Sequence, residues 1–514
     1  MLKCGKIYKS KLHGYDVRKY TLTTSDGYKL ELHRLVHPSE LLARKLGKRV
    51  EKKKPYLLLH GLLGSSASFL AGAPPEQVAP GATMDLNGHI GRILEARQRE
   101  FVHTFSSCAD QFRGAHQADK PDKWARKQQR KFAHSLELDF DSDPNVFASA
   151  YRQAHRKVHF PLDAFKLVSN SLAFTLANFN YDVWLMNSRG NYYSRTTNRR
   201  FSAANPEYWN FRIETLVRED LLAAIDLIKR VNECSEPIGL VSYSYSSMQV
   251  LNLLSKFPAQ LEAVQPVIML APTLLTANSN PDKVRRTLLR SVSKVLLAKN
   301  GPFPSLGRQT GSSGGGPMER LESTIEQLLC KLPIFSKFCH LFETVLLGRS
   351  KKITTVKGLL SSDQQELRRE NECGQTSLAI MHQIINNLQE VTVLPQFSPQ
   401  ENINRGLISR QKLPRRSVIL VHSLGDEIST PAEVEMLRKR ALRDLTLVDY
   451  FIEQAKFQHT DFLFAQNNQF LVNAEVVRMA AIYDFLLYHP RARALPLQLH
   501  DGPLAARAKP PPAP

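Results

Sequence analysis

Three side chains of the kinds that carry out acyl transfer are spread along this sequence of 514 residues. Ser244 lies in the stretch GLVSYSYSSMQVL, residues 239 to 251, between an apolar run and a helical pattern. Asp426 and His459 each follow a later apolar run. A serine nucleophile needs a base that takes its proton and an acid group that orients the base. The chain order Ser244, Asp426, His459 therefore predicts a nucleophile, an acid and a base.

Ser244 stands at the centre of a turn whose flanking residues are larger than usual. A nucleophilic serine commonly lies on a strand-turn-helix elbow of the form GxSxG, since small flanks fit where strand and helix crowd together. Here Ser242 and Ser246 replace the glycines, and both are hydroxyl nucleophiles by chemistry, although they flank the apex. Two outcomes are open: the turn tolerates the added atoms, or they distort it and misplace Oγ, at a cost of about 1–3 kcal/mol per residue. Taken alone, the stretch is also explained as a group of helix-capping serines.

An oxyanion hole is predicted beside the elbow. The stretch HGLLGSS, residues 60 to 66, begins where the apolar run 56–60 ends. Its glycine-bearing turn lets a backbone N–H, expected from Leu62, point toward the same place as the N–H of Tyr245. Two such donors stabilise a developing oxyanion, each by about 10²- to 10³-fold in rate. The sequence has no CxxC pair and no Cys/His cluster at zinc spacing, so neither a metal nor a cofactor is expected.

Six short apolar runs must position these side chains. The runs are continuous rather than alternating, which predicts strands covered on both faces, as in a parallel sheet flanked by helices. Helical patterns at 216–231 and 248–257 lie on either side of one run, and this alternation favours an α/β sheet with right-handed crossovers. Functional sites in such sheets form at the carboxyl ends of the strands. The runs are 56–60, 181–186, 238–241, 267–271, 417–422 and 447–452.

Three segments depart from this alternation. Residues 71–160 begin rich in proline and glycine and then become basic, which predicts an irregular insertion. Residues 275–390 carry helical patterns that predict a cap over the site, with a flexible segment at 301–317. The tail, 491–514, is predicted to be disordered. The α/β core is expected in the remaining parts of the chain, 14–70, 160–275 and 391–490.

Charge and hydropathy limit the partners. The formal net charge of +21 favours anionic surfaces, such as phospholipid headgroups. No nucleic-acid-binding motif accompanies it, so nucleic acid is not an expected partner. No apolar run reaches 18 residues, and the N-terminal stretch MLKCGKIYKSKLHGYDV lacks the apolar core of a secretory signal. Peripheral contact with an anionic membrane or a lipid-droplet surface is the expected interaction, and the sequence leaves the oligomeric state open.

The sequence resembles one family, the acid lipases, an α/β-hydrolase group that includes lysosomal acid lipase, gastric lipase and the fungal steryl ester hydrolases. The most specific match is SLAFTLANFNYDVWLMNSRGNYYSR, residues 171–195. The likeness covers most of 14–70 and 160–490. Other matching stretches, in family order, are GYDVRKYTLTTSDGYKLELHRL, YLLLHGLLGSSASF, EYWNF, LAPT, GQTS, GDEISTPAEV and HTDFLF.

This resemblance implies an α/β-hydrolase fold with an inserted helical cap, and a lipase that cleaves lipid esters such as triacylglycerols or sterol esters. It implies a lysosomal or secretory location, with an intracellular lipid surface as the alternative. Spacing alone leaves a disulfide between Cys330 and Cys339 open, whereas the resemblance matches them with a cysteine pair of the family cap. The roles that it implies are nucleophile for Ser244, acid for Asp426, base for His459, and oxyanion donors for Leu62 and Tyr245.

The elbow is where the sequence departs from the family, whose members read GHSQG at this place. Ser242, Tyr243, Tyr245 and Ser246 all differ from that pattern. The departure supports an alternative of another class, a protein that keeps the fold but is catalytically impaired and binds lipid or a protein partner. The retained acid and base favour the enzyme. The leading hypothesis is a serine ester hydrolase that works through an acyl-enzyme.

Overall fold

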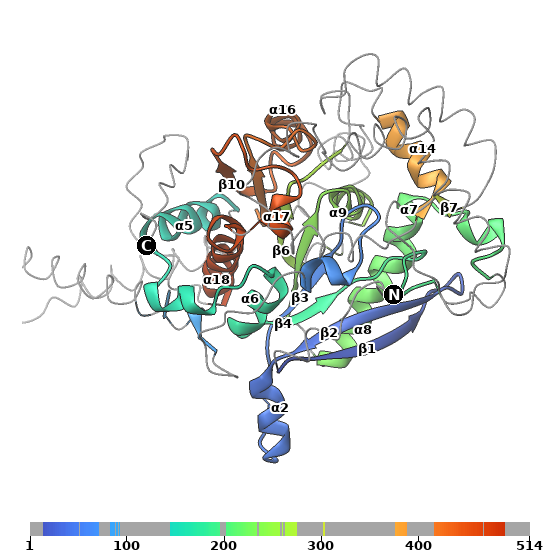
Figure 1. The fold of residues 1–514 in the computed structure, drawn as a ribbon. Coiled ribbons are helices and arrows are strands. Elements are labelled where there is room, and N and C mark those ends of the chain that lie inside the picture. Colours follow the sequence, from blue (N-terminus) through green and yellow to red (C-terminus); the bar gives the residue numbers. More distant parts are fainter. Residues whose placement is uncertain are drawn as a thin grey trace, which may run out of the picture.

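An eight-stranded sheet runs through the computed structural model, with helices on both of its faces (Figure 1). The helices and strands occur in the order of an α/β protein, and within the described residues helical segments directly follow every parallel strand except β6. The residues that the structure describes are 14–50, 52–70, 83–87, 89–90, 92, 144–195, 202–233, 236–257, 260, 263–274, 302–303, 376–387, 416–465 and 467–488.

The strand order is β1-β2-β4-β3-β5-β6-β9-β10. The pairs β1·β2 and β2·β4 are antiparallel, and all other neighbours are parallel. Each of the six apolar runs forms a strand. The sheet thereby confirms the predicted fold class, a mostly parallel α/β-hydrolase sheet. The strand bounds are β1 (Asp16–Thr23), β2 (Lys29–Val36), β3 (Pro55–Leu59), β4 (Asp182–Leu185), β5 (Ile238–Tyr243), β6 (Val264–Leu270), β9 (Val418–Ser423) and β10 (Thr446–Ile452).

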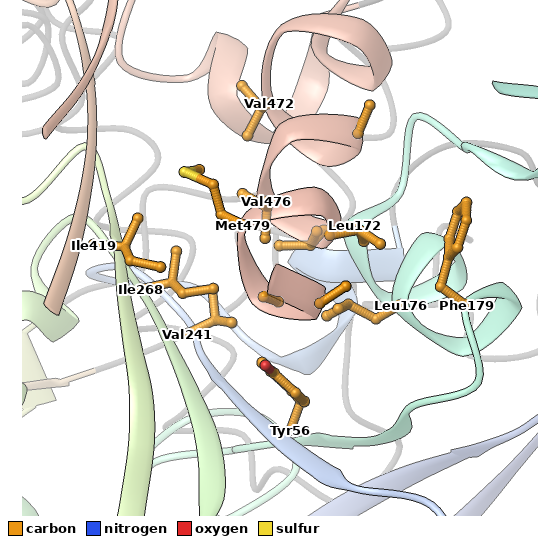
Figure 2. Close-up of a cluster of buried hydrophobic side chains, with 14 of the residues drawn as sticks. Tyr56, Leu172, Leu176, Phe179, Val241, Ile268, Ile419, Val472, Val476 and Met479 are labelled. Carbon is orange, nitrogen blue, oxygen red and sulfur yellow. The ribbon is translucent and has the colours of Figure 1, made fainter. Parts of the chain in front are cut away.

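Successive residues of the central strands enter two hydrophobic cores on opposite faces of the sheet. In β9, Ile419 and Val421 belong to one core and Val418 and Leu420 to the other. Burial on both faces is the reason that these strands are continuous apolar runs in the sequence. Figure 2 shows the first core, where sheet residues such as Ile268 face helices α6 (Leu172–Asn178) and α18 (Ala474–Tyr488).

The second core packs against helices from several parts of the chain. A π-helical turn, Leu216–Leu221, leads into one of them, α8. The helix that follows the predicted nucleophile is α9, and every residue from Ser246 to Ser255 in it is buried. The helices on this face are α7 (Ile213–Thr215), α8 (Leu222–Asn232), α9 (Ser246–Lys256), α14 (Leu378–Asn387) and α16 (Pro431–Met436).

Part of the segment predicted as an irregular insertion belongs to the core. Helix α5 (Pro144–Lys157) packs on α18, with Phe147, Tyr151 and Ala154 buried. The Tyr151 hydroxyl donates to the carbonyl of Met479 at 2.9 Å. Regular structure packed on the core therefore begins at Pro144, before the boundary expected at residue 160. The apolar spacing over 147–154 is helical, but this short stretch follows a long basic segment and was not recognised as a helix.

The predicted cap lies mostly outside the described residues. Within the described part, α14 buries Ile380, Met381 and Ile384 against the second core. The segment 301–317 was expected to be flexible, yet β7 (Pro302–Phe303) pairs with β8 (Thr376–Ser377). Cys330, Cys339 and the tail 491–514 lie outside the described residues. Among the helices described, none is long and apolar enough to cross a membrane.

Candidate active site

Ser244 occupies a strained turn between β5 and α9. Its φ angle is +58°, in the left-handed region that non-glycine residues rarely adopt. Its N–H donates to the carbonyl of Leu270 on the neighbouring strand at 2.9 Å, which fixes the turn to the carboxyl end of the sheet. Helix α9 begins two residues later, at Ser246. This strand-turn-helix geometry, with Ser244 at the apex, is the kind that a nucleophile elbow has.

The structure brings the three predicted side chains together. His459 Nε2 lies 2.6 Å from Ser244 Oγ, and His459 Nδ1 lies 2.7 Å from Asp426 Oδ2. All three residues are buried. A carboxylate can only accept, so Nδ1 carries the hydrogen toward Asp426 and Nε2 is left to accept the serine proton. These contacts form a hydrogen-bonded relay from a hydroxyl through an imidazole to a carboxylate.

Backbone donors hold the carboxylate of Asp426. Its Oδ1 accepts from the N–H groups of Ile428 and Ser429, both at 2.8 Å, while Oδ2 faces the histidine. Each oxygen thus has a separate task. This local Asx-type turn fixes the rotamer of Asp426 before any substrate binds.

Gly425 lets the loops that carry Asp426 and His459 approach each other. A β-carbon at Gly425 would lie 2.6 Å from the carbonyl oxygen of Ala455 and 2.7 Å from that of Phe457, closer than real β-carbons come. The Ser423 hydroxyl donates to the same Phe457 carbonyl at 2.8 Å. The sequence shows a glycine in this turn, but only the structure reveals that its missing side chain sets the distance between the two loops.

The two flanking serines fit without displacing the apex. Ser246 Oγ accepts from the N–H of Tyr243 and lies 2.9 Å from the carbonyls of both Leu59 and Tyr243, to which its hydroxyl can donate. Ser242 Oγ lies 3.4 Å from Ser247 Oγ. Both flanks are fully buried. Instead of distorting the elbow, the hydroxyl of Ser246 ties the end of β5 to the end of β3.

Tyr243 is a residue of the site that the sequence reasoning noted only as a departure. Its hydroxyl donates to the backbone carbonyl of His459 at 3.0 Å. Its ring stacks on the imidazole, with centroids 5.4 Å apart and planes at 30°. A large aromatic residue directly before the elbow serine was the signal in the sequence. Tyr243 therefore connects the elbow to the loop of the predicted base.

The predicted oxyanion positions lie on either side of the elbow. Leu62 follows β3, and Tyr245 follows the apex; both are buried. Gly61 lies against the elbow, since a β-carbon there would be 3.0 Å from the Tyr243 ring and 3.5 Å from Ser244 Cβ. Within the described part of the chain, neither the Leu62 N–H nor the Tyr245 N–H has a hydrogen-bond acceptor. Buried backbone donors are seldom left unpaired, which suits donors kept for a ligand oxygen.

A neutral histidine anchors the loop that carries the predicted oxyanion donor Leu62. Burial lowers the pKa of His60 to about 4, so its imidazole is uncharged near neutral pH. Nδ1 lies 2.8 Å from the carbonyl of Gly61 and donates to it, which leaves Nε2 to accept from the N–H of Ser188 at 3.2 Å. The histidine of the HG pair thus joins the loop to the segment after β4.

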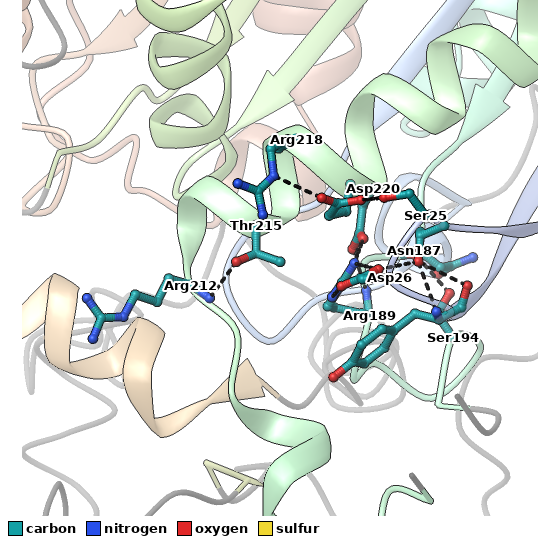
Figure 3. A network of polar contacts seen from close by, with 12 residues as sticks. Ser25, Asp26, Asn187, Arg189, Ser194, Arg212, Thr215, Arg218 and Asp220 are labelled. Carbon is teal, nitrogen blue, oxygen red and sulfur yellow. Dashed lines mark hydrogen bonds and ion pairs between the residues drawn. The ribbon is translucent and has the colours of Figure 1, made fainter. Parts of the chain in front are cut away.

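The segment after β4 is itself fixed by a partly buried ion network (Figure 3). Arg189, only 1% exposed, donates to Asp220 at 2.5 Å and 2.8 Å and to Asp26 at 2.6 Å. Its guanidinium also lies 3.9 Å from the centre of the Tyr28 ring. Burial alone would raise the pKa of Asp26, but hydrogen bonds and charge from Arg189 hold it below its usual value.

Asn187 links the segment after β4 to the loop that follows β3. Its Oδ1 accepts from the N–H of Ser66 at 3.0 Å, and its Nδ2 donates to the carbonyl of Glu31 at 3.0 Å. Asn187 and Arg189 thus support the site without entering it. Among the described residues, no group of three or more His, Cys, Asp or Glu side chains could hold a metal ion.

Comparison with known proteins adds to this geometry. Residues 7–73 match the family model described as a partial alpha/beta-hydrolase lipase region. The chain is 30% identical over 184 residues to human lipase member K, covering 35% of this chain and 42% of that relative. It is 24% identical over 311 residues to a probable lipase of Schizosaccharomyces pombe, covering 60% and 62%.

A third relative is aligned over more of its length. The chain is 26% identical over 324 residues to the gastric triacylglycerol lipase of Mus musculus, covering 61% of this chain and 75% of that relative. The aligned stretches of the first two relatives span 42% and 62% of them, less than two thirds of either protein.

Proposed function

The chain belongs to the acid lipase family of α/β-hydrolases, and from this premise we propose that it is a carboxylic ester hydrolase that cleaves lipid esters. The proposed substrates are triacylglycerols and sterol esters. The first rests on the relative named gastric triacylglycerol lipase, and the second on the resemblance to steryl ester hydrolases. No metal or cofactor takes part in the proposed reaction.

In the proposed reaction, Ser244 attacks the ester carbonyl while His459 takes the hydroxyl proton. Asp426 holds the imidazole in the tautomer that accepts this proton and stabilises the imidazolium that forms. The carbonyl oxygen becomes an oxyanion, which accepts hydrogen bonds from the N–H groups of Leu62 and Tyr245. His459 then gives its proton to the leaving alcohol, and water hydrolyses the acyl-enzyme by the same route.

One observation carries the proposal, the relay of 2.6 Å and 2.7 Å hydrogen bonds that ends on a serine held at φ +58°. A non-glycine residue with positive φ costs free energy, and such residues cluster at functional sites. A serine that only capped helix α9 would need neither the strain nor a buried imidazole bonded to its hydroxyl. The unpaired N–H groups beside it supply the remaining element of an acyl-transfer site.

A fluorophosphonate probe tests the nucleophile, because it forms a covalent bond only with an activated serine. The wild-type protein should be labelled, and Ser244→Ala should not. Ser242→Ala is the matched control, since Ser242 is a buried serine two residues away whose hydroxyl, among the described residues, has only a 3.4 Å contact with the Ser247 hydroxyl; it should still be labelled. Hydrolysis of triacylglycerol and sterol ester emulsions by the same three proteins then identifies the substrate.

The outcomes separate the enzyme from the alternative of a non-catalytic binding protein. If the folded wild-type protein is not labelled and releases no fatty acid, the proposed hydrolase is wrong and the binding protein is favoured. Labelling that persists in Ser244→Ala would instead assign the nucleophile to another serine.

A further inference from the structure

Helix α2 (Pro38–Lys45) projects away from the sheet, as Figure 1 shows, and carries apolar side chains into solvent. Leu42 is 57% exposed and Leu46 is 59% exposed. Residues four apart on a helix are neighbours on its surface, so the two leucines form one apolar spot. A single exposed leucine needs no explanation, but a pair on a projecting helix suits burial against a partner.

Positive charge surrounds this apolar spot. Arg44 is bonded to Glu40 at 2.9 Å, which leaves its charge largely compensated. Lys45, Lys48 and Arg49 are exposed, and within the described residues none of the three has an acidic partner. We call residues 38–49 the α2 projection. It combines two exposed leucines with three unpaired cations.

The α2 projection lies at the end of the molecule opposite the candidate active site. It connects the end of β2 to the start of β3, and β2 is antiparallel to β4, so the projection is at the amino ends of the parallel strands. Ser244 and His459 follow the carboxyl ends of such strands. The five residues of β3 alone separate the two ends by about 17 Å.

We propose that the α2 projection docks the protein on the surface of an anionic phospholipid bilayer. Leu42 and Leu46 would enter the interfacial layer, while Lys45, Lys48 and Arg49 meet the phosphate and carboxylate headgroups. Stable attachment of a peripheral protein needs two such signals together, an apolar insertion and a basic cluster. An anionic bilayer satisfies both, whereas a nucleic acid offers only the negative charge. In this orientation Ser244 faces away from the bilayer, so the proposal does not depend on the proposed enzyme activity.

Vesicle sedimentation of the full chain tests the docking. The protein should bind vesicles of phosphatidylcholine with phosphatidylserine more tightly than pure phosphatidylcholine, and added salt should weaken binding. The variant K45Q/K48Q/R49Q should lose about fivefold in affinity per charge, or about a hundredfold in all. The variant L42S/L46S should also lose at least about tenfold, since the removed side chains no longer enter the interface.

A matched control separates a docking surface from the effect of net charge. The variant K439Q/R440Q/R443Q removes an equal number of positive charges, among them that of Lys439, which is paired with Glu435 at 2.6 Å, from the π-helical turn Leu437–Ala441 and its exit, near β10 at the other edge of the sheet. It should bind as the wild-type protein does. Vesicles should also slow amide hydrogen exchange in residues 38–49 and leave residues 60–66 unchanged.

Three results would overturn the proposal. The first is a protein that does not sediment with anionic vesicles. The second is an equal loss of binding in K439Q/R440Q/R443Q and K45Q/K48Q/R49Q, which would assign binding to total charge. The third is protection from exchange at 60–66 instead of 38–49, which would place the bilayer at the site end. All substituted side chains are at least partly exposed, so unchanged thermal unfolding serves as the folding check.

Discussion

The hydroxyl of Tyr243 donates to the backbone carbonyl of His459 at 3.0 Å, and the two rings stack. The residue directly before the elbow serine thus holds the histidine that bonds to this serine. The acid lipases, which read GHSQG at the elbow, have a histidine where this chain has Tyr243. The longer side chain of Tyr243 reaches the loop after β10. We regard Tyr243 as a positioning residue for the proposed base.

Removal of that hydroxyl should weaken the reaction without changing the fold. In Tyr243→Phe the ring can still stack, but the His459 carbonyl loses its donor, and the imidazole gains freedom to leave the line between Ser244 and Asp426. We expect kcat to fall about tenfold with KM little changed, because a small misplacement of a reacting group is costly. Steady-state kinetics on a soluble ester measures this. An unchanged kcat would show that stacking alone positions the ring.

Asp426 should affect kcat because it sets which tautomer His459 adopts. Asp426→Asn can donate a hydrogen to Nδ1, which places the imidazole hydrogen on Nε2, where the serine proton must be accepted. We expect kcat to fall by about 10⁴-fold, the size of effect known for such relays. The backbone bonds to Ile428 and Ser429 remain available to the amide oxygen, so the fold should survive. Activity within tenfold of wild type would remove Asp426 from the mechanism.

A methyl group at position 425 should separate the acid from the base. Its β-carbon would meet the carbonyls of Ala455 and Phe457 at 2.6 Å and 2.7 Å. We expect Gly425→Ala to lower the free energy of unfolding by about 1–3 kcal/mol and to reduce kcat as the loops part. Leu424→Ala is the control, because Leu424 is 49% exposed and precedes the same turn; its stability should change by less than about 0.5 kcal/mol. Urea unfolding compares the two.

Buried histidines should make the fold sensitive to acid. Burial lowers the pKa of His37 and of His60 to about 4, and unfolding returns each toward about 6.5. Between these values the unfolded chain binds more protons than the folded one, so the free energy of unfolding falls as pH falls. The full contribution is present above pH about 6.5, and about 3 kcal/mol per histidine is lost by pH about 4.

His37→Asn isolates one of these contributions. Asparagine can still cap helix α2 by accepting from the Ser39 N–H, as His37 Nδ1 does at 3.2 Å, but it does not titrate. Urea unfolding at several pH values in this window should give a shallower pH dependence for the variant, by about one proton. An identical slope for both proteins would mean that His37 does not titrate on unfolding.

The sheet and the relay could be predicted because both depend on short-range signals. Strands buried on both faces are continuous apolar runs, and all six runs became strands. Ser244, Asp426 and His459 each follow a different strand directly, and parallel strands bring their carboxyl ends to one edge. Position after a strand was therefore enough to expect that the three side chains meet.

What the sequence could not show depends on contacts between distant segments. Helix α5 has a short apolar face at the end of a long basic segment, and its role becomes clear only from its packing on α18. The close approach at Gly425 depends on a loop about 30 residues later in the chain, and the support of Asn187 for Ser66 joins segments 121 residues apart. Of the two outcomes left open for Ser246, the structure has the tolerated one, since its hydroxyl bonds to the carbonyls of Leu59 on β3 and Tyr243 on β5.

The left-handed backbone of Ser244 has a consequence for how this chain can change. Glycine adopts such a conformation without the steric cost that a β-carbon brings. Ser244→Gly should therefore remove the nucleophile and also relieve the backbone strain at the turn. A protein without catalytic function would have no need of a strained serine at this position. The left-handed backbone of Ser244 therefore favours the enzyme over the non-catalytic binding protein.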